Sequence, residues 1–232
     1  MVDKETQSLL LLVYDINPIV WGGRTEPDFL TITEQILTFV NAFLMWSSSN
    51  RVAVLVSHPM KSGFVYPLPG AQTLSSTADF PAPKIASELK KWAEIPVESK
   101  YSESLLPGAL STALCYIMRA LRESPGLKPR ILVCDSETAR QVVNSSNDVS
   151  SQYKAMMNCV FSAQKQAIPV DALNLADSDS LFLQQATDLT NGIYYRVVRK
   201  EHVSLLQFLL TVFLPDEGLR KFLVLPQHTQ AP

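Results

Sequence analysis

Two acidic residues end apolar runs of the sequence, and they are the first candidates for chemistry. Asp15 closes the run at residues 9–15, and Asp135 closes the run at residues 130–135. If these runs are neighbouring parallel strands, the two carboxylates meet at the carboxyl edge of the sheet, where such folds bind ligands. Asn17 adds a third oxygen donor, and Mg²⁺ prefers oxygen ligands. Asp15, Asn17 and Asp135 therefore form a candidate cation site.

A second interpretation of these residues needs no metal. Acidic side chains at the ends of strands often accept hydrogen bonds from backbone N–H groups in the turns that follow. Asp15 and Asp135 then stabilise turns, and this alternative is the favoured one.

Motifs for enzyme chemistry are missing from the sequence. Gly22 and Gly23 follow the first apolar run without the G-x-G-x-x-G spacing of a dinucleotide site, and there is no phosphate-binding P-loop motif. No serine lies in a G-x-S-x-G turn, and His58 ends a strand beside Pro59, where a bystander role is expected and not catalysis. The stretch at residues 177–180 lacks the glycine and glutamate of a calcium loop, so it is predicted to cap a helix. These absences favour a protein that is not an enzyme.

Strand-like and helix-like segments alternate along the chain. Short apolar runs typical of buried strands occupy residues 9–15, 51–56, 130–135, 169–175 and 193–197, with a short hairpin partner at 63–66. Helical spacing of apolar residues covers 28–46, 84–94, 105–123, 149–168, 181–190 and 203–213. This alternation predicts an α/β fold with a doubly wound, mostly parallel central sheet and helices on both faces. We expect one domain over residues 1–232, with a flexible loop at 67–83 and a loose tail from 226.

Composition limits the possible partners. The net charge is −2, and the basic residues are scattered, so we expect no strong direct binding to nucleic acid. Cys115, Cys134 and Cys159 have neither disulfide-framework nor zinc-site spacing and are expected in the core. The polar N-terminus and the short apolar runs predict a soluble protein without a signal peptide or membrane span.

Several motifs carry a resemblance to a known family. They are DINPIVWGG at residues 15–23, ESLLPGALSTALCYI at 103–117, NCVFSAQKQAIPVDALNLADSDS at 158–180, LQQATDLTNGIYYRV at 183–197 and LLQFLLTVFLPD at 205–216. In this order they resemble the von Willebrand A domain of the thirty-four-kilodalton subunits of TFIIH, the general transcription and DNA repair factor. The resemblance spans nearly the whole chain and is weakest at residues 67–100.

This resemblance implies a function as well as a fold. It implies a non-catalytic scaffold in the nucleus that binds the forty-four-kilodalton subunit and other TFIIH core subunits. The complex would support transcription initiation by RNA polymerase II and nucleotide excision repair. Full-length members of the family carry a cysteine-rich zinc module after the A domain. The sequence lacks those cysteines, so we expect no cofactor in this chain and zinc only in that module.

The resemblance also bears on the cation site. Metal-binding A domains end their first strand in Asp-x-Ser-x-Ser, and this chain has Asp15, Asn17 and Ile19 at these places. At the position of a further threonine ligand the chain has Leu105 or Leu106. Apolar side chains cannot coordinate a cation, so the site is predicted to be degenerate. A metal-dependent, ligand-binding A domain is the alternative function.

Three apolar residues are candidates for contact with a protein partner. Trp21 lies in the loop that holds a metal in relatives, and its alternative is ordinary core packing on the first helix. Met157 and Phe161 lie off the main apolar stripe of their predicted helix, which indicates either burial on two sides or an interface.

Overall fold

A single mixed sheet organises the chain. The structure is a computed structural model that describes residues 7–23, 28–68, 81–97, 103–136, 148–197 and 204–223. Within these ranges, six strands form the sheet in the order β3-β2-β1-β4-β5-β6. The strands are β1 (Ser8–Asp15), β2 (Arg51–Ser57), β3 (Ser62–Tyr66), β4 (Lys128–Asp135), β5 (Val170–Asn174) and β6 (Tyr194–Arg196). Only β3 is antiparallel to its neighbour, which confirms the predicted hairpin and the mostly parallel sheet.

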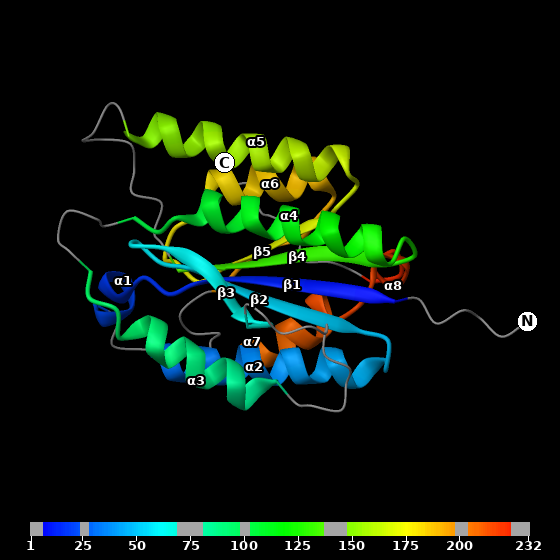
Figure 1. Ribbon diagram of the computed structural model, residues 1–232, viewed down its shortest axis with the longest axis horizontal. Helices are drawn as coiled ribbons and strands as arrows, with labels where there is room; N and C mark the ends of the chain where they lie inside the picture. Colours follow the sequence, from blue (N-terminus) through cyan, green and yellow to red (C-terminus); the bar gives the residue numbers. More distant parts are fainter. Residues whose placement is uncertain are drawn as a thin grey trace, which may run out of the picture.

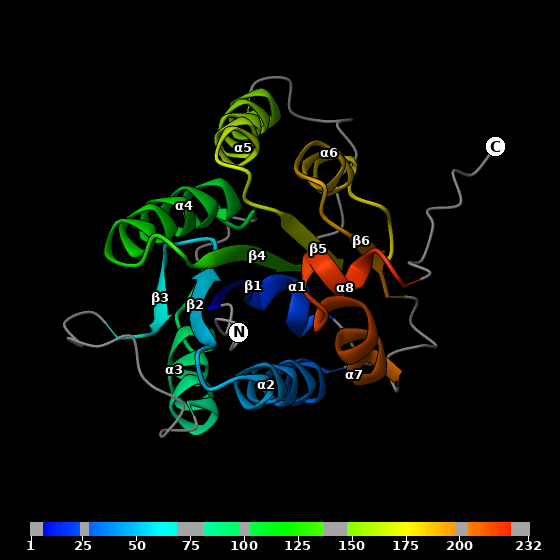
Figure 2. The ribbon, with the colours of Figure 1, turned by 90° about the vertical axis from the view of Figure 1, so that its right-hand side faces the viewer.

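Helices cover both faces of the sheet, as predicted for a doubly wound fold. They are α1 (Pro18–Gly22), α2 (Phe29–Trp46), α3 (Ala82–Ala93), α4 (Leu106–Glu123), α5 (Asp148–Lys165), α6 (Leu181–Thr190), α7 (Leu205–Phe208) and α8 (Glu217–Arg220). A π-helical segment, Leu209–Phe213, continues α7. Figures 1 and 2 show α4, α5 and α6 on one face and α2, α3 and α7 on the other.

The apolar side chains of the central strand β1 explain why helices must cover both faces of the sheet. Side chains alternate along β1, so Leu9, Leu11 and Val13 enter the core under α4, α5 and α6. Leu10 and Leu12 enter the opposite core, which α2 and α7 close. A strand buried on both faces reads as a continuous apolar run, and this is the pattern that predicted it.

Helix α2 illustrates how a core helix can look like a membrane span. It has 18 residues and is long and apolar enough to cross a bilayer by length and composition, which the sequence-based expectation of only short apolar runs overlooked. Its residues Ile32, Ile36, Phe39 and Val40 are buried against the sheet. The helix begins at Asp28, whose Oδ1 accepts a hydrogen bond from the Thr31 N–H at 2.8 Å. These contacts fit a core helix of this fold.

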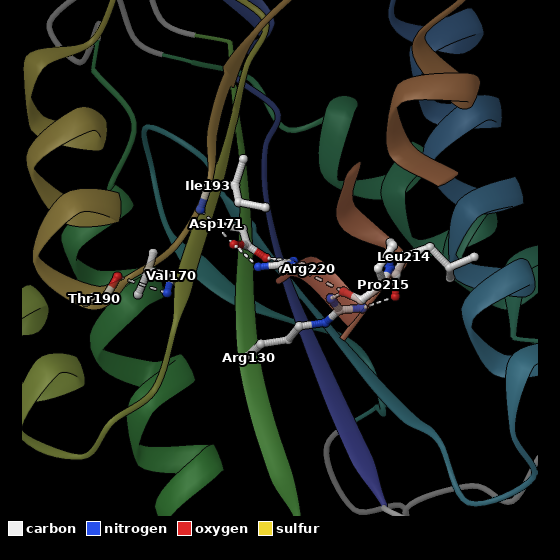
Figure 3. A network of polar contacts seen from close by, with 8 residues as sticks. All are labelled: Arg130, Val170, Asp171, Thr190, Ile193, Leu214, Pro215 and Arg220. Atoms are coloured by element: carbon white, nitrogen blue, oxygen red, sulfur yellow. Dashed lines mark hydrogen bonds and ion pairs between the residues drawn. The ribbon is translucent and has the colours of Figure 1, made fainter. Parts of the chain in front are cut away.

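A buried ionic network ties α8 and the residues just before it to the sheet (Figure 3). Asp171 of β5 accepts two hydrogen bonds from the guanidinium of Arg220, at 2.8 and 2.5 Å. Arg130 of β4 donates to the carbonyl oxygens of Pro215 and Leu214, at 2.9 and 3.1 Å. Burial lowers the pKa of Arg130 to about 10. The network fixes α8 at the amino end of β5, although Arg220 follows Asp171 by 49 residues in the sequence.

Two predicted segments, the loop at 67–83 and the tail from 226, lie wholly or partly outside the residues that the structure describes. Helix α3 begins at Ala82, inside the loop predicted at 67–83, because Ile85 and Leu89 anchor its first turns in the core. The rest of that loop, residues 69–80, lies outside the described residues, as does the tail predicted from residue 226.

Candidate functional site: the carboxyl edge of the sheet

The two acidic residues do meet at the carboxyl edge of the sheet. Strand β1 pairs in parallel with β4, with Tyr14 opposite Cys134, so the next residues, Asp15 and Asp135, end neighbouring strands. Ser57 of β2 lies opposite Asp15 on the other side. The edge therefore places the two acidic residues on neighbouring strand ends, at the point where the chain runs to either side of β1.

One oxygen of Asp15 and the side-chain oxygen of Asn17 accept hydrogen bonds from other parts of the protein. Asp15 is fully buried, and its Oδ2 accepts a hydrogen bond from the hydroxyl of Ser136. Asn17 is fully buried too, and its Oδ1 accepts from the Ile19 N–H at 3.1 Å as the N-cap of α1. The Asp135 carbonyl oxygen accepts from the Leu175 N–H at 2.7 Å. Two of the three candidate side chains thus stabilise local structure.

Apolar side chains occupy the remaining ligand positions. Ile19 is exposed, and Leu105 is the N-cap residue of α4 without any side-chain cap. Across the residues that the structure describes, no group of three or more His, Cys, Asp or Glu side chains could hold a metal ion. Ile19 and Leu105 therefore bring no oxygen ligand to this edge of the sheet.

Sequence reasoning missed Ser136. Its hydroxyl is fully buried and lies 121 residues from Asp15 along the chain. The only signal in the sequence is a small hydroxyl residue directly after an acid that ends a strand. Sequence alone could not show which carboxylate it reaches, because the choice depends on the pairing of β1 with β4.

A second polar cluster fills the same edge at β5 and β6. The Tyr194 hydroxyl donates to Oδ1 of Asp179 at 3.0 Å and accepts hydrogen bonds from Asn174 Nδ2 at 2.7 Å and the Ser180 N–H at 3.1 Å. Arg196 forms an ion pair with Asp179 at 3.1 Å. The segment 177–180 does precede a helix, with Ser180 at the N-cap position. It makes no side-chain cap there, so its predicted capping chemistry is wrong.

The structure places Trp21 in the core. Its side chain is only 8% exposed, and its Nε1 donates to the backbone carbonyl oxygen of Asp15 at 3.2 Å. Its ring packs edge-on against Tyr14 and Phe29, with centroids 6.4 and 5.4 Å away. Of the alternatives for Trp21, this position fits ordinary core packing and not contact with a partner, because the ring fills the space between α1, α2 and the end of β1.

Met157 and Phe161, the two candidates on α5, differ in their exposure to solvent. Phe161 is 52% exposed, and Met157 is partly buried. Met156 and Val160, on the main stripe of the helix, are buried against the sheet. Phe161 thus keeps a solvent-facing aromatic ring on a helix that already has a well-packed inner face.

Comparisons with known proteins agree with this architecture. The family model described as transcription factor Tfb4 matches residues 7–231. General transcription factor IIH subunit 3 of Dictyostelium discoideum is 39% identical over 85% of this chain and 56% of its own length. General transcription and DNA repair factor IIH subunit TFB4 of Saccharomyces cerevisiae is 32% identical over 98% of this chain and 74% of its own length. The chain therefore spans just over half of the first relative and about three-quarters of the second.

Solved structures give the same result. The chain is similar to the N-terminal domain of TFIIH p34, with a TM-score of 0.73 and 29% identity over 88% of this chain and 96% of that chain. It is also similar to the VWA domain of SpRpn10, with a TM-score of 0.60, covering 88% of this chain and 94% of that one; at 12% identity this likeness shows the fold alone. The chain has a von Willebrand A-type fold and belongs to the transcription factor Tfb4 family, the family of the p34 subunits of TFIIH.

Proposed function

We propose that this chain is a scaffold domain of TFIIH that binds the forty-four-kilodalton subunit and so supports transcription initiation and nucleotide excision repair in the nucleus. The observation that carries the proposal is the state of the carboxyl edge. Asp15 bonds Ser136, Asn17 caps α1, and Ile19 replaces an oxygen ligand. Because Asp15 Oδ2 and Asn17 Oδ1 accept internal hydrogen bonds, the outer surfaces of the helices are the regions that we expect to contact other molecules.

The names of the relatives support this assignment. The yeast relatives are subunits of a general transcription and DNA repair factor, and a subunit works by contact with other subunits of its complex. TFIIH acts on genes in the nucleus, which supports the nuclear location proposed for this chain.

Binding would follow the general anatomy of protein interfaces. A buried apolar centre supplies most of the free energy, and a polar rim sets orientation. The part of the domain that the structure describes is well packed, because both core layers are filled and the Asp171–Arg220 ion pair holds α8 to β5. A preorganised surface loses little conformational entropy on binding.

The proposal is tested by isothermal titration calorimetry of the whole chain with the purified forty-four-kilodalton subunit. We expect saturable binding with one-to-one stoichiometry and a negative heat-capacity change, since apolar surface is buried. The VWA domain of SpRpn10 serves as a matched control with the same fold and 12% identity. Absence of binding by this chain, or equal binding by the control, would refute the proposal.

A further inference from the structure

A buried histidine joins the end of β2 to the end of α3. His58 directly follows β2 and is fully buried. Its ring lies at 66° to the ring of Trp92, in the last turn of α3, with the two centroids 6.5 Å apart. A Cβ on Gly63 of β3 would lie 3.2 Å from the Trp92 ring, so this ring also lies close against β3. Figure 2 shows α3 beneath β2 and β3, on the face of the sheet that carries α2.

The hydrogen bonds of the turn at residues 58–61 require a neutral imidazole. His58 Nδ1 accepts a hydrogen bond from the Met60 N–H at 3.2 Å, and the His58 N–H donates to the Lys61 carbonyl oxygen at 3.2 Å. Both ring nitrogens of an imidazolium are donors, so protonation removes the acceptor of the Met60 N–H. Protonation also places a charge on a fully buried side chain, which is unfavourable without a partner of opposite charge.

Lys61 adds a positive charge to this corner of the domain. Its Nζ lies over the Trp92 ring, 4.5 Å from the centroid. Burial lowers the pKa of His58, the charge of Lys61 lowers it further, and the backbone of Ile95 acts in the opposite direction. A protonated His58 would therefore meet a like charge that already lies over Trp92.

The acidic side chains around α3 do not offset that charge in the part of the chain that the structure describes. Glu88 forms an ion pair with Lys91 on the same helix at 2.5 Å, and Glu94 is exposed at the helix end. Lys61 is the charged side chain that acts on His58. The other charged side chains of α3 and of its neighbour α2 are exposed to solvent: Lys84, Lys90 and Glu34. The packed arrangement thus favours the neutral imidazole.

Helix α3 is held at two places that differ in kind. Ile85 and Leu89 are 0% and 2% exposed and fix its first turns in the core that α2 also covers. The partly buried Trp92 holds its last turn through contacts with His58 and Gly63. Loss of the second contact leaves the first intact, so the last turn can move while the core stays packed. Local opening of this kind requires less free energy than global unfolding.

We propose that His58 and Trp92 form a proton-sensitive latch, which holds the last turn of α3 against β3 while His58 is neutral and releases it when His58 is protonated. Release moves the imidazolium into water and frees the turn at residues 58–61 together with Trp92. The surface formed by this turn and the end of α3 changes shape, whereas both core layers stay filled. The latch does not depend on the function proposed above.

The direction of the pH dependence follows from linkage. The imidazole of the open form titrates near its ordinary pKa of about 6.5, and that of the closed form titrates lower because His58 is buried beside Lys61. Between these two pKa values the open form takes up the proton first. Its population rises by up to about tenfold for each pH unit that the pH falls, and above about pH 6.5 it does not depend on His58.

Fluorine NMR of the whole chain with 5-fluorotryptophan tests the latch between about pH 7.5 and about pH 5.5. The chain has three tryptophans, so each gives one resonance, and Trp92→Phe assigns the resonance of interest. We expect the Trp92 resonance to move toward that of Trp46, which is 67% exposed, as the pH falls below about 6.5. The resonance of Trp21, which is 8% exposed in the core, should stay in place and show that the domain remains folded.

Two variants connect the movement to the proton. His58→Asn keeps an acceptor for the Met60 N–H and cannot titrate, so the Trp92 resonance should no longer depend on pH. Lys61→Met keeps an apolar chain over Trp92 and removes the charge, so the dependence should become shallower. Lys90→Met, which removes another exposed lysine next to the same turn of α3, is the matched control and should behave as the wild type.

Three results would overturn the latch. A Trp92 resonance that does not move with pH in the wild type shows that the last turn of α3 stays closed. An equal movement in His58→Asn assigns it to another group, and a joint movement of Trp92 and Trp21 assigns it to global unfolding. Lys61 is exposed, so Lys61→Met is expected to fold even if His58→Asn does not, and a wild-type pH dependence in Lys61→Met also contradicts the proposal.

Discussion

The hydroxyl of Ser136 donates a hydrogen bond to the carboxylate of Asp15, and this contact joins the carboxyl ends of β1 and β4. Both side chains are fully buried. In a metal-binding A domain the first acid of this edge would face a cation. Here it serves to hold two strands together.

We expect Mg²⁺ or Mn²⁺ to leave the melting temperature unchanged, because Asp15 Oδ2 and Asn17 Oδ1 already accept hydrogen bonds from Ser136 and the Ile19 N–H, and Ile19 has no oxygen to offer. A ligand at about 100 times its Kd would stabilise the fold by about 2.7 kcal/mol. Differential scanning calorimetry across a metal titration measures the effect. A rise of several degrees that disappears in Asp15→Asn would restore the alternative of a metal-dependent, ligand-binding domain.

Replacement of Arg220 should strongly lower the free energy of unfolding. Arg220→Met leaves the Asp171 carboxylate, which is 1% exposed, without its cationic partner. Loss of one member of a buried pair costs about 3–5 kcal/mol, and urea denaturation measures the change. The matched control is Arg196→Met, since the Arg196–Asp179 pair is well exposed and should contribute less than about 1 kcal/mol. Equal losses in the two variants would contradict the importance of burial.

The buried imidazole of His58 makes stability depend on pH. Burial is the main cause that lowers the pKa of His58, Lys61 adds to it, and a backbone hydrogen bond with Ile95 opposes both. The unfolded chain therefore takes up the proton first as pH falls, so the contribution of neutral His58 is complete above about pH 6.5 and is lost below it.

Substitution isolates this effect. His58→Asn keeps an acceptor for the Met60 N–H, which His58 Nδ1 now receives at 3.2 Å, and removes the titration. The free energy of unfolding, followed from pH 7.5 to 5, should fall less steeply for the variant, by at most about 1.4 kcal/mol per pH unit. Parallel curves for the two proteins would show that His58 does not contribute.

Trp21 should matter for folding and not for binding. Trp21→Ala removes a ring packed between Tyr14 and Phe29, which costs about 3–5 kcal/mol. Trp46→Ala, on an exposed ring, should change stability by less than about 0.5 kcal/mol. Thermal unfolding compares the two. Should Trp21→Phe keep the fold and still abolish partner binding, the discarded role of Trp21 as a contact residue would return.

Gly192 has no space for a side chain. A Cβ at this position would lie 1.8 Å from the carbonyl oxygen of Val170, so the backbone of β5 must move. We expect Gly192→Ala to destabilise the domain by at least about 3 kcal/mol. Gly126→Ala meets nothing within 4 Å and is the control. Chemical denaturation of both variants decides, and a tolerated Gly192→Ala would contradict this packing.

The local pattern of apolar and polar residues determined most strands of this protein and the end of α6. Continuous apolar runs predicted strands buried on both faces, and the structure has β1, β2, β4 and β5 at those places. Asn191 predicted the end of α6, and it adopts the left-handed conformation with φ of 56°. The sequence also predicted that Asp15 and Asp135 meet, because acids that end neighbouring parallel strands share one edge.

Tertiary structure decided which groups these side chains meet. Asp15 and Ser136 are 121 residues apart, Asp171 and Arg220 are 49 apart, and no local pattern encodes either pairing. The sequence could not decide whether Trp21 is buried or whether Phe161 is exposed. The residue type shows that each side chain is apolar, and periodicity shows only which side of its own helix it lies on. Whether another element covers that side depends on how distant segments pack, and this packing made Trp21 core and left Phe161 at the surface.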